Sequence, residues 1–193
     1  MICASYETFL AYEAQARNCL EFQPLLIPGQ LQTEPYARAV TEQSFLALGP
    51  DQVDDLVEVR MQRQKRLCGD SPLVLDAVVT EAALRLQVGG PEVMRAQLRH
   101  LRRVFELPNV TFRVIPYTAG ARAAITGAFT LFASGENLSD AAAFTEAADN
   151  TTAFRDEALV LRRLNRLFKN LSRAALSAQD SCELLERIEK ELV

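Results

Sequence analysis

The clearest pattern of apolar and polar positions lies in residues 81–128, and it predicts one helix followed by one strand. Pro91 follows two glycines, and its missing N–H suits the first turn of a helix. Apolar side chains then recur at helical spacing, at Met94, Leu98, Leu101 and Phe105. Residues 110–115 alternate as a half-buried strand does. The strand leads into a loop of small residues, 119–127, and such loops are where sites tend to be built.

The rest of the chain shows helical patterns towards both ends and strand patterns in the middle. Helices are expected at about residues 4–20, 33–40, 51–67, 160–171 and 177–192. Further strands are expected at 73–79, 128–133 and 141–145, the last two joined by a hairpin turn at Gly135-Glu136-Asn137. We therefore expect one α+β domain, with a small sheet of about four strands flanked by about six helices. It would comprise N-terminal helices in residues 1–70, a sheet-containing core in 71–150 and C-terminal helices in 151–193.

Composition narrows the class of protein. The 193 residues fit one domain, and a hydrophobic share of 49% is enough for a core. No apolar run is long enough for a membrane span, and no secretory signal opens the sequence, so we expect a cytoplasmic protein. The four cysteines are scattered and His100 is the single histidine, which argues against a metal cluster and for reduced thiols. We also find no phosphate-binding glycine motif, and we expect no cofactor.

Charge is unevenly distributed along the chain. The net charge is −4, but residues 1–59 hold two basic and nine acidic side chains, whereas residues 60–103 hold nine basic and four acidic ones. A net-acidic chain is a poor match for phosphate backbones, so no direct DNA binding is expected. The basic middle could be a solvated helix face, or it could meet an anionic ligand or an acidic partner.

Carboxylates are the groups best suited to chemistry in this sequence, because His100 lies inside a predicted helix and is a poor candidate for a catalytic triad. Glu81 and Glu146 each follow an apolar strand, and Asp76 interrupts one. A carboxyl group beside apolar walls has a raised pKa and can exchange protons near neutral pH. We therefore predict Glu81 and Glu146 as catalytic residues. The structural alternatives are a helix N-terminal acid for Glu81, a solvated strand end or salt bridge for Glu146, and a hydrogen-bonded strand residue for Asp76.

Aromatic and basic side chains are the candidates for binding a ligand. Arg60 and Arg63 share one predicted helix and could clamp a planar anion, although a salt-bridged helix face is the alternative. The phenylalanines of three strands could form ordinary core or could wall a pocket between sheet and helices. The predicted ligand-binding residues are Tyr36, Arg60, Arg63, Phe112, Tyr117, Arg122, Phe129 and Phe144.

Five segments of the sequence resemble a known family in their order and spacing. They are PLLIPGQLQTEPYARAV (24–40), EVRMQRQKRL (58–67), TEAALRLQVGGPEVMRAQLRHL (80–101), LPNVTFRVIPYTAGARA (107–123) and RAALSAQDS (173–181). Together they resemble the C-terminal effector-like domain of actinobacterial Xre-type helix-turn-helix regulators, the WhiJ-like or antitoxin-like regulators. The resemblance implies an actinobacterial cytoplasmic protein and a domain that senses a ligand or a partner.

Three features depart from that family's pattern. The helix-turn-helix domain that usually precedes this region is not in the sequence, so either the sequence is a shortened form of a longer protein or it is a stand-alone version with another role. Arg122 stands where the family prefers a histidine, and Ala143-Phe144-Thr145-Glu146 replaces the family's valine-tyrosine-valine-glutamate strand. These changes alter the chemistry of the expected pocket.

Two classes of function fit these observations. The first is a stand-alone, cofactor-free biosynthetic enzyme of secondary metabolism that uses a carboxylate as general acid and base, in a condensation or cyclisation of the Pictet–Spengler type. The second is a regulatory or antitoxin-like module that senses a ligand or partner. Both predict a small organic molecule as the guest, and the chain could also pair with a second copy or with a small protein partner. The sequence favours the enzyme, because a sensor without a DNA reader has no direct way to act on a promoter.

Overall fold

A six-stranded mixed sheet forms the centre of the molecule, with the strand order β3-β2-β1-β4-β5-β6. The structure is a computed structural model that describes residues 4–43, 49–123, 126–135, 141–146 and 152–192. The strands are β1 (Asn18–Gln23), β2 (Val74–Thr80), β3 (Val110–Ile115), β4 (Phe129–Ala133), β5 (Ala141–Glu146) and β6 (Thr152–Arg155). β1, β2 and β3 are parallel, whereas β4 runs antiparallel to β1 and the remaining pairs are also antiparallel.

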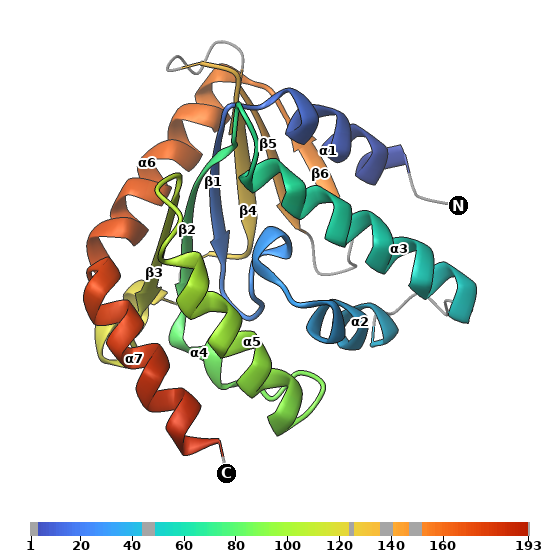
Figure 1. Ribbon diagram of the computed structural model, residues 1–193. Coiled ribbons are helices and arrows are strands. Elements are labelled where there is room, and N and C mark those ends of the chain that lie inside the picture. Colours follow the sequence, from blue (N-terminus) through green and yellow to red (C-terminus); the bar gives the residue numbers. More distant parts are fainter. Residues whose placement is uncertain (1–3, 44–48, 124–125, 136–140, 147–151, 193) are drawn as a thin grey trace.

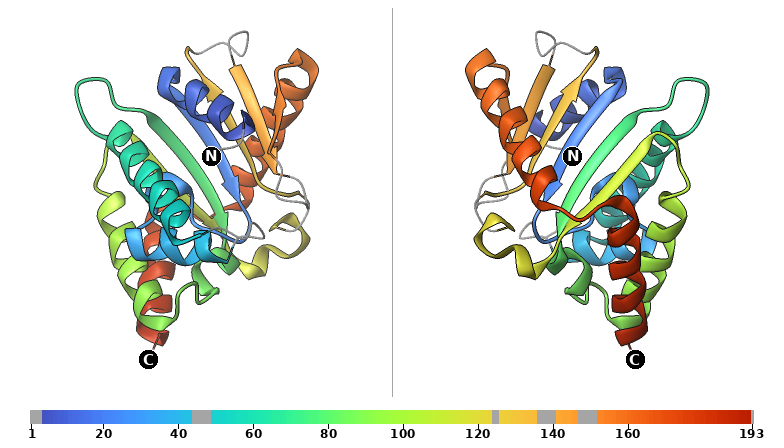
Figure 2. Two further views of the ribbon diagram at one scale, coloured as in Figure 1. Left: turned by 90° about the vertical axis from the view of Figure 1, so that its right-hand side faces the viewer. Right: turned by 90° about the vertical axis from the view of Figure 1, so that its left-hand side faces the viewer.

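Helices cover both faces of this sheet (Figure 1). The helices are α1 (Ala4–Gln15), α2 (Glu34–Glu42), α3 (Pro50–Arg63), α4 (Glu81–Arg85), α5 (Pro91–Val104), α6 (Ala158–Ala174) and α7 (Ala178–Glu191), with 3-10 turns η1 (Gly29–Leu31), η2 (Gln64–Leu67) and η3 (Tyr117–Ala123). Figure 2 shows α2 and α3 on one side of the sheet and the long α6 on the other. α7 follows α6 and packs on α5 and β3.

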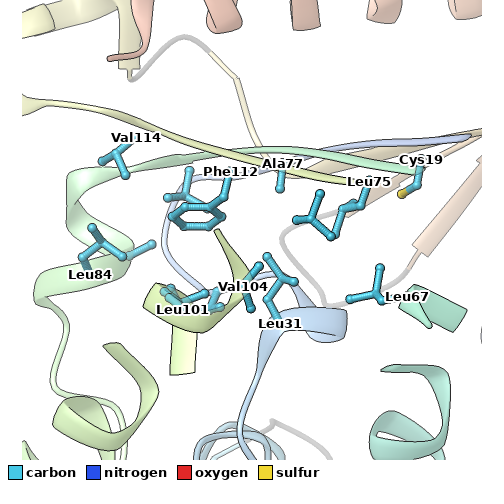
Figure 3. Packing of buried hydrophobic residues seen from close by; sticks show 14 of the residues in the cluster. Cys19, Leu31, Leu67, Leu75, Ala77, Leu84, Leu101, Val104, Phe112 and Val114 are labelled. Carbon is cyan, nitrogen blue, oxygen red and sulfur yellow. The ribbon is translucent and has the colours of Figure 1, made fainter. Parts of the chain in front are cut away.

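Because successive side chains of a strand point to opposite faces, the apolar core is divided into two clusters. The larger cluster joins alternate residues of the sheet, such as Cys19 and Phe112, to α2, α4, α5, α7 and η1. Figure 3 shows part of it, with Phe112 of the sheet facing Leu101 of α5. The smaller cluster joins Phe22 and Phe129 to the apolar side of α6.

The expected α+β class agrees with this mixed architecture, but the expected sheet of about four strands is too small. β1 lies partly within the predicted helix 4–20, because α1 ends at Gln15. β6 falls within the segment expected to hold only C-terminal helices. The predicted hairpin turn at Gly135-Glu136-Asn137 lies largely outside the described residues. Among those residues, no helix is both long and apolar enough to cross a membrane.

Candidate functional site

A cavity with both polar and apolar walls lies at the carboxyl end of β1, beneath α1, η1 and α3. Its volume is about 150 Å³, room for on the order of ten water molecules or one small organic molecule. In the sheet, β2 and β3 lie on one side of β1, and β4, which comes later in the chain, lies on the other side. The cavity therefore lies where the strand order changes direction, which is the usual place for ligand sites in open sheets.

The floor of the cavity is the sheet face that carries polar side chains near these strand ends. Glu21 of β1 pairs in register with Thr130 of β4, and Thr130 pairs with Phe144 of β5. Two residues further along β5, Glu146 faces the same cavity. Gln23 donates hydrogen bonds from Nε2 to Glu21 Oε1 at 3.2 Å and to Glu146 Oε1 at 3.4 Å. One amide thus links two carboxyl groups that reach the cavity from different strands.

The roof of the cavity contains a buried ion pair between α1 and α3. Arg63 donates from Nε to Glu13 Oε2 at 2.6 Å and from Nη2 to Glu13 Oε1 at 2.8 Å, a two-pronged contact that fixes both side chains. Gln30 also donates to Glu13, and Arg63 stacks 4.9 Å from the centre of the Phe9 ring. Burial alone would lower the pKa of Arg63, but the hydrogen bonds and charge of Glu13 outweigh it and raise that pKa. Glu13 therefore neutralises Arg63 and accepts its charged hydrogen bonds.

Arg60 is the second cation of the roof, and its hydrogen-bonding capacity is only partly used. Its Nη1 donates to Gln32 Oε1 at 3.0 Å, while its buried Nε has no hydrogen-bond partner among the described residues. Burial lowers the pKa of Arg60, and the nearby Tyr6 opposes this effect. A guanidinium remains charged in proteins, so the unused Nε is a donor next to the cavity with no acceptor assigned to it.

The segment that closes the cavity is pinned by buried polar contacts. Gln32 Nε2 donates to the carbonyl of Ile27 at 2.7 Å, and the Ile27 N–H donates to the Tyr36 hydroxyl at 3.2 Å. Gln97 of α5 donates to the Leu31 carbonyl at 2.7 Å. These bonds satisfy backbone groups of a loop that lacks regular pairing, so the cavity roof is fixed before any ligand arrives.

Glu21 carries the unusual electrostatics of this site. Glu21 is buried, with only 6% of its surface exposed. Burial raises the pKa of Glu21 from its usual 4.5 to about 7; Arg63 and the hydrogen bond from Gln23 oppose this rise, whereas the charges of Glu13 and Glu146 add to it. At neutral pH the carboxyl group is therefore divided between its protonated and ionised forms.

Four of the residues predicted from the sequence meet at this cavity: Arg60, Arg63, Phe144 and Glu146. They come from α3 and β5, which are about eighty residues apart in the chain. Glu146 is exposed at the rim, so the expected apolar surroundings belong to Glu21 instead. That Arg60, Arg63 and Phe144 bind a ligand and that Glu146 is catalytic stay predictions. The structure brings the four together around Glu21, a carboxyl group that was not predicted as part of a site.

Glu81 lies elsewhere and has a structural environment. It begins α4 and is 7% exposed. Its Oε2 accepts the Tyr117 N–H at 2.9 Å, and its Oε1 accepts Arg85 Nε at 2.7 Å. One oxygen thus ties α4 to the start of η3 and the other forms an ion pair within α4, and a catalytic role for Glu81 stays a prediction. Asp76 likewise pairs with Arg113 at 2.6 Å.

The remaining predicted residues do not line the cavity. Tyr36 and Phe112 are core residues of the larger cluster, although Tyr36 supports the cavity roof through its hydroxyl group. Phe129 points to the α6 face of the sheet, so it cannot share a pocket with Phe112 and Phe144. Tyr117 is 57% exposed, and Arg122 lies beside α6 at a different hollow.

The sequence reasoning missed Glu13, Glu21 and Gln32 of this site. Glu21 interrupts the run Cys19-Leu20-Glu21-Phe22, and this charged residue between apolar neighbours is the signal that could have marked it. We did not predict a strand here, because residues 4–20 were expected to form a helix. Glu13 lies on α1, and the sequence of α1 does not indicate that Glu13 pairs with Arg63 of α3.

Comparison with known proteins places the chain in one family. A family model described as a domain of unknown function (DUF5753) matches residues 6–187 and so spans the cavity and both faces of the sheet. No curated protein and no solved structure matches the chain. The chain therefore belongs to the DUF5753 family of domains of unknown function.

Proposed function

We propose that the cavity at the end of β1 binds a small organic molecule that carries an amine, and that Glu21 exchanges a proton with it. The single observation that carries the proposal is a buried carboxyl group with a pKa of about 7 on the wall of the cavity. Burying such a group without a cation costs stability, and this cost is explained if a ligand supplies the missing charge.

The charges around the cavity favour a cationic guest. Glu13 neutralises Arg63, which leaves Arg60 as the cation and Glu21 and Glu146 as the acids. An ammonium group between Glu21 and Glu146 would lower the pKa of Glu21 and balance the second negative charge. The guanidinium of Arg60, which lines the cavity, could then hold a carbonyl or carboxylate oxygen at the other end of the molecule.

The chemistry that these groups support is proton transfer, because the described residues that line the cavity include no cysteine, serine, histidine or lysine. Ionised Glu21 takes a proton from the bound ammonium, and the free amine attacks an aldehyde to form a carbinolamine. Glu21 returns the proton to the hydroxyl group, which leaves as water and gives an iminium ion. Ring closure then joins an aromatic carbon to the iminium carbon, and that aromatic carbon loses its proton to Glu21. Glu21 passes this proton to the product amine, which restores the carboxylate. This cycle needs no cofactor and is the acid–base condensation, of Pictet–Spengler type, for which a carboxylate with a pKa near 7 is suited.

Binding is tested with three probes of one shape: phenethylamine, 2-phenylethanol and phenylacetate. At pH 8 we expect phenethylamine alone to raise the melting temperature, because only it carries a cation to Glu21. The Glu21→Gln variant should lose this shift, whereas Glu34→Gln, which changes an exposed glutamate, should keep it. Equal shifts for the three probes, or an unchanged response of Glu21→Gln, would contradict the proposal.

Turnover is tested by incubating the protein with a small arylethylamine and an aldehyde and following the cyclised product by mass spectrometry. We expect product with the wild type and none above background with Glu21→Gln.

Binding without turnover would favour the second candidate function, a sensing module. Its support is the resemblance of five segments to effector-like domains of helix-turn-helix regulators, together with a cavity roof that is fixed by buried hydrogen bonds. In a sensor, proton release from Glu21 on binding an amine would report the ligand without any reaction.

A further inference from the structure

The outer side of α6 carries a straight row of cations. Arg162, Arg166, Lys169 and Arg173 follow one another by four, three and four positions, which places them on one side of a helix. All four are exposed. The opposite side of the helix packs on the sheet through the smaller core cluster. At 1.5 Å per residue the row, here called the α6 basic row, is about 16 Å long.

The cations of the α6 basic row repel one another, and the described residues offer them no ion-pair partner. α6 contains no acidic residue, and in the described part of the chain none of the four cations forms an ion pair. Like charges at this spacing destabilise a helix. The other exposed basic helix, α5, is treated differently, because Arg99 and Arg102 pair with Glu189 and Glu186 of α7. The cations of α5 are thus partly neutralised by acids of α7, whereas those of the α6 basic row are available to an external anion.

The row ends beside a hollow that suits a single acidic group. Arg173 shares a hollow of about 280 Å³ with Arg122 of η3 and with Asn170, and Leu171 and Ala174 form its apolar wall. Two guanidinium groups and an amide from different elements present donors to one small space. A carboxylate is the anion that such forked donors bind with defined geometry.

We propose that the outer face of α6 docks an acidic segment of a partner protein, with one carboxylate of that segment held between Arg122 and Arg173. An acidic peptide fits better than a nucleic acid for two reasons. Four cations neutralise few phosphates, and such binding fades at physiological salt. The chain as a whole is negative, with a net charge of −4, so it repels an extended polyanion. A short acidic segment meets only the row and the hollow.

The direct test is fluorescence anisotropy with a labelled peptide that carries four glutamates at the spacing of the row. The control probes are the same peptide with glutamines, and single-stranded and duplex DNA. The test variant is Arg162→Gln/Arg166→Gln/Lys169→Gln/Arg173→Gln. The matched control is Arg17→Gln/Lys65→Gln/Arg103→Gln/Arg187→Gln, which removes the same net charge from exposed cations outside the row.

We expect the glutamate peptide to bind and the glutamine peptide not to bind. The row variant should bind about tenfold more weakly, and the control variant should stay within about twofold of the wild type. Arg122→Gln alone should weaken binding by about threefold, because it removes one side of the hollow. Thermal melts of each variant show that the fold is kept.

Three results would overturn the proposal. Equal weakening of the row and control variants would mean that net charge alone attracts the peptide. Tighter binding of DNA than of the peptide at physiological salt would assign the row to nucleic acid. Self-association at low salt, abolished by Asp51→Lys/Asp55→Lys/Glu58→Lys, would assign it to a second copy, because the exposed side of α3 carries acids at the same spacing.

Discussion

Two glutamates at the ends of neighbouring parallel strands show how differently one fold can use the same side chain. Glu81 follows β2 and Glu21 lies near the end of β1, and their residues are 7% and 6% exposed. Glu81 gives one oxygen to Arg85 and the other to the Tyr117 N–H. Glu21 has the neutral amide of Gln23 as its hydrogen-bonding neighbour, and its pKa rises to about 7.

The lesson of this comparison is that burial alone does not make a carboxyl group reactive. A buried acid whose two oxygens accept from a cation and from an N–H donor, as those of Glu81 do, becomes a structural connection. A buried acid whose nearest arginine is already engaged keeps a proton that it can exchange. In this protein Arg63 gives its hydrogen bonds to Glu13, so its charge only partly offsets the effect of burial on the pKa of Glu21.

The largest effect should follow from removing Glu13. Glu13→Ala leaves Arg63 buried without its partner, which typically costs about 3–5 kcal/mol of unfolding free energy. Urea denaturation at pH 7 measures the loss. Arg63 would also become free to pair with Glu21, and the pKa of Glu21 should fall. As a control, Glu34→Ala removes the exposed partner of Arg38 and should cost less than about 1 kcal/mol. A similar loss in both variants would mean that the buried pair has no special role.

Neutralising Glu21 should stabilise the protein at high pH. Because the folded protein binds the Glu21 proton more tightly than the unfolded chain, stability falls as pH rises from 4.5 to about 7 and is then constant. At about 1.4 kcal/mol per pH unit this interval amounts to roughly 3 kcal/mol. Glu21→Gln should therefore be more stable than the wild type at pH 8 by roughly 2–3 kcal/mol. Urea denaturation across this pH range measures both proteins, and an unchanged slope in the variant would show that another group titrates.

Removing Glu81 should act in the opposite direction. Glu81→Ala breaks two hydrogen bonds, one of them charged, and should lower stability by about 1–3 kcal/mol at pH 8. The phenethylamine response should be kept, because Glu81 does not line the cavity. Loss of ligand binding with unchanged stability would reverse the roles assigned to the two glutamates.

The smallest effect is expected from Glu146. This residue is exposed at the rim, and Glu146→Gln should change stability by less than about 0.5 kcal/mol. Its charge contributes to the raised pKa of Glu21, so the variant should shift that titration to lower pH. Carbon-13 NMR of the glutamate side chains measures the shift directly. An unchanged Glu21 titration in this variant would show that the two carboxyl groups do not interact electrostatically.

Much of the sheet could be predicted because its strands carry local signals. β2, β3, β4 and β5 lie close to their expected positions, as do α5 and the two C-terminal helices. β1 was obscured because it is the centre of the sheet and is buried on both faces, so its residues do not alternate cleanly between apolar and polar. β6 has four residues, too few for a pattern to stand out.

Only part of the candidate site could be predicted from local patterns in the sequence. Arg60 and Arg63 could be placed on one helix face from their spacing, and Glu146 could be placed at a strand end. That these residues line one cavity could not be predicted, because it depends on how α3 is placed relative to β1 and β5 in the folded protein. Phe129 illustrates the limit, since a shift of one position along a strand turns a side chain to the other face of the sheet.

Spacing over a few residues was enough to predict the α+β class and the helices that flank the sheet, because each of these patterns is local. The tertiary structure alone decided which glutamate is tied down and which keeps its proton. The charge state of a buried acid depends on the partners that reach it from distant segments. Here Glu13 of α1 accepts the hydrogen bonds of Arg63, whereas Glu21 accepts one from the neutral amide of Gln23.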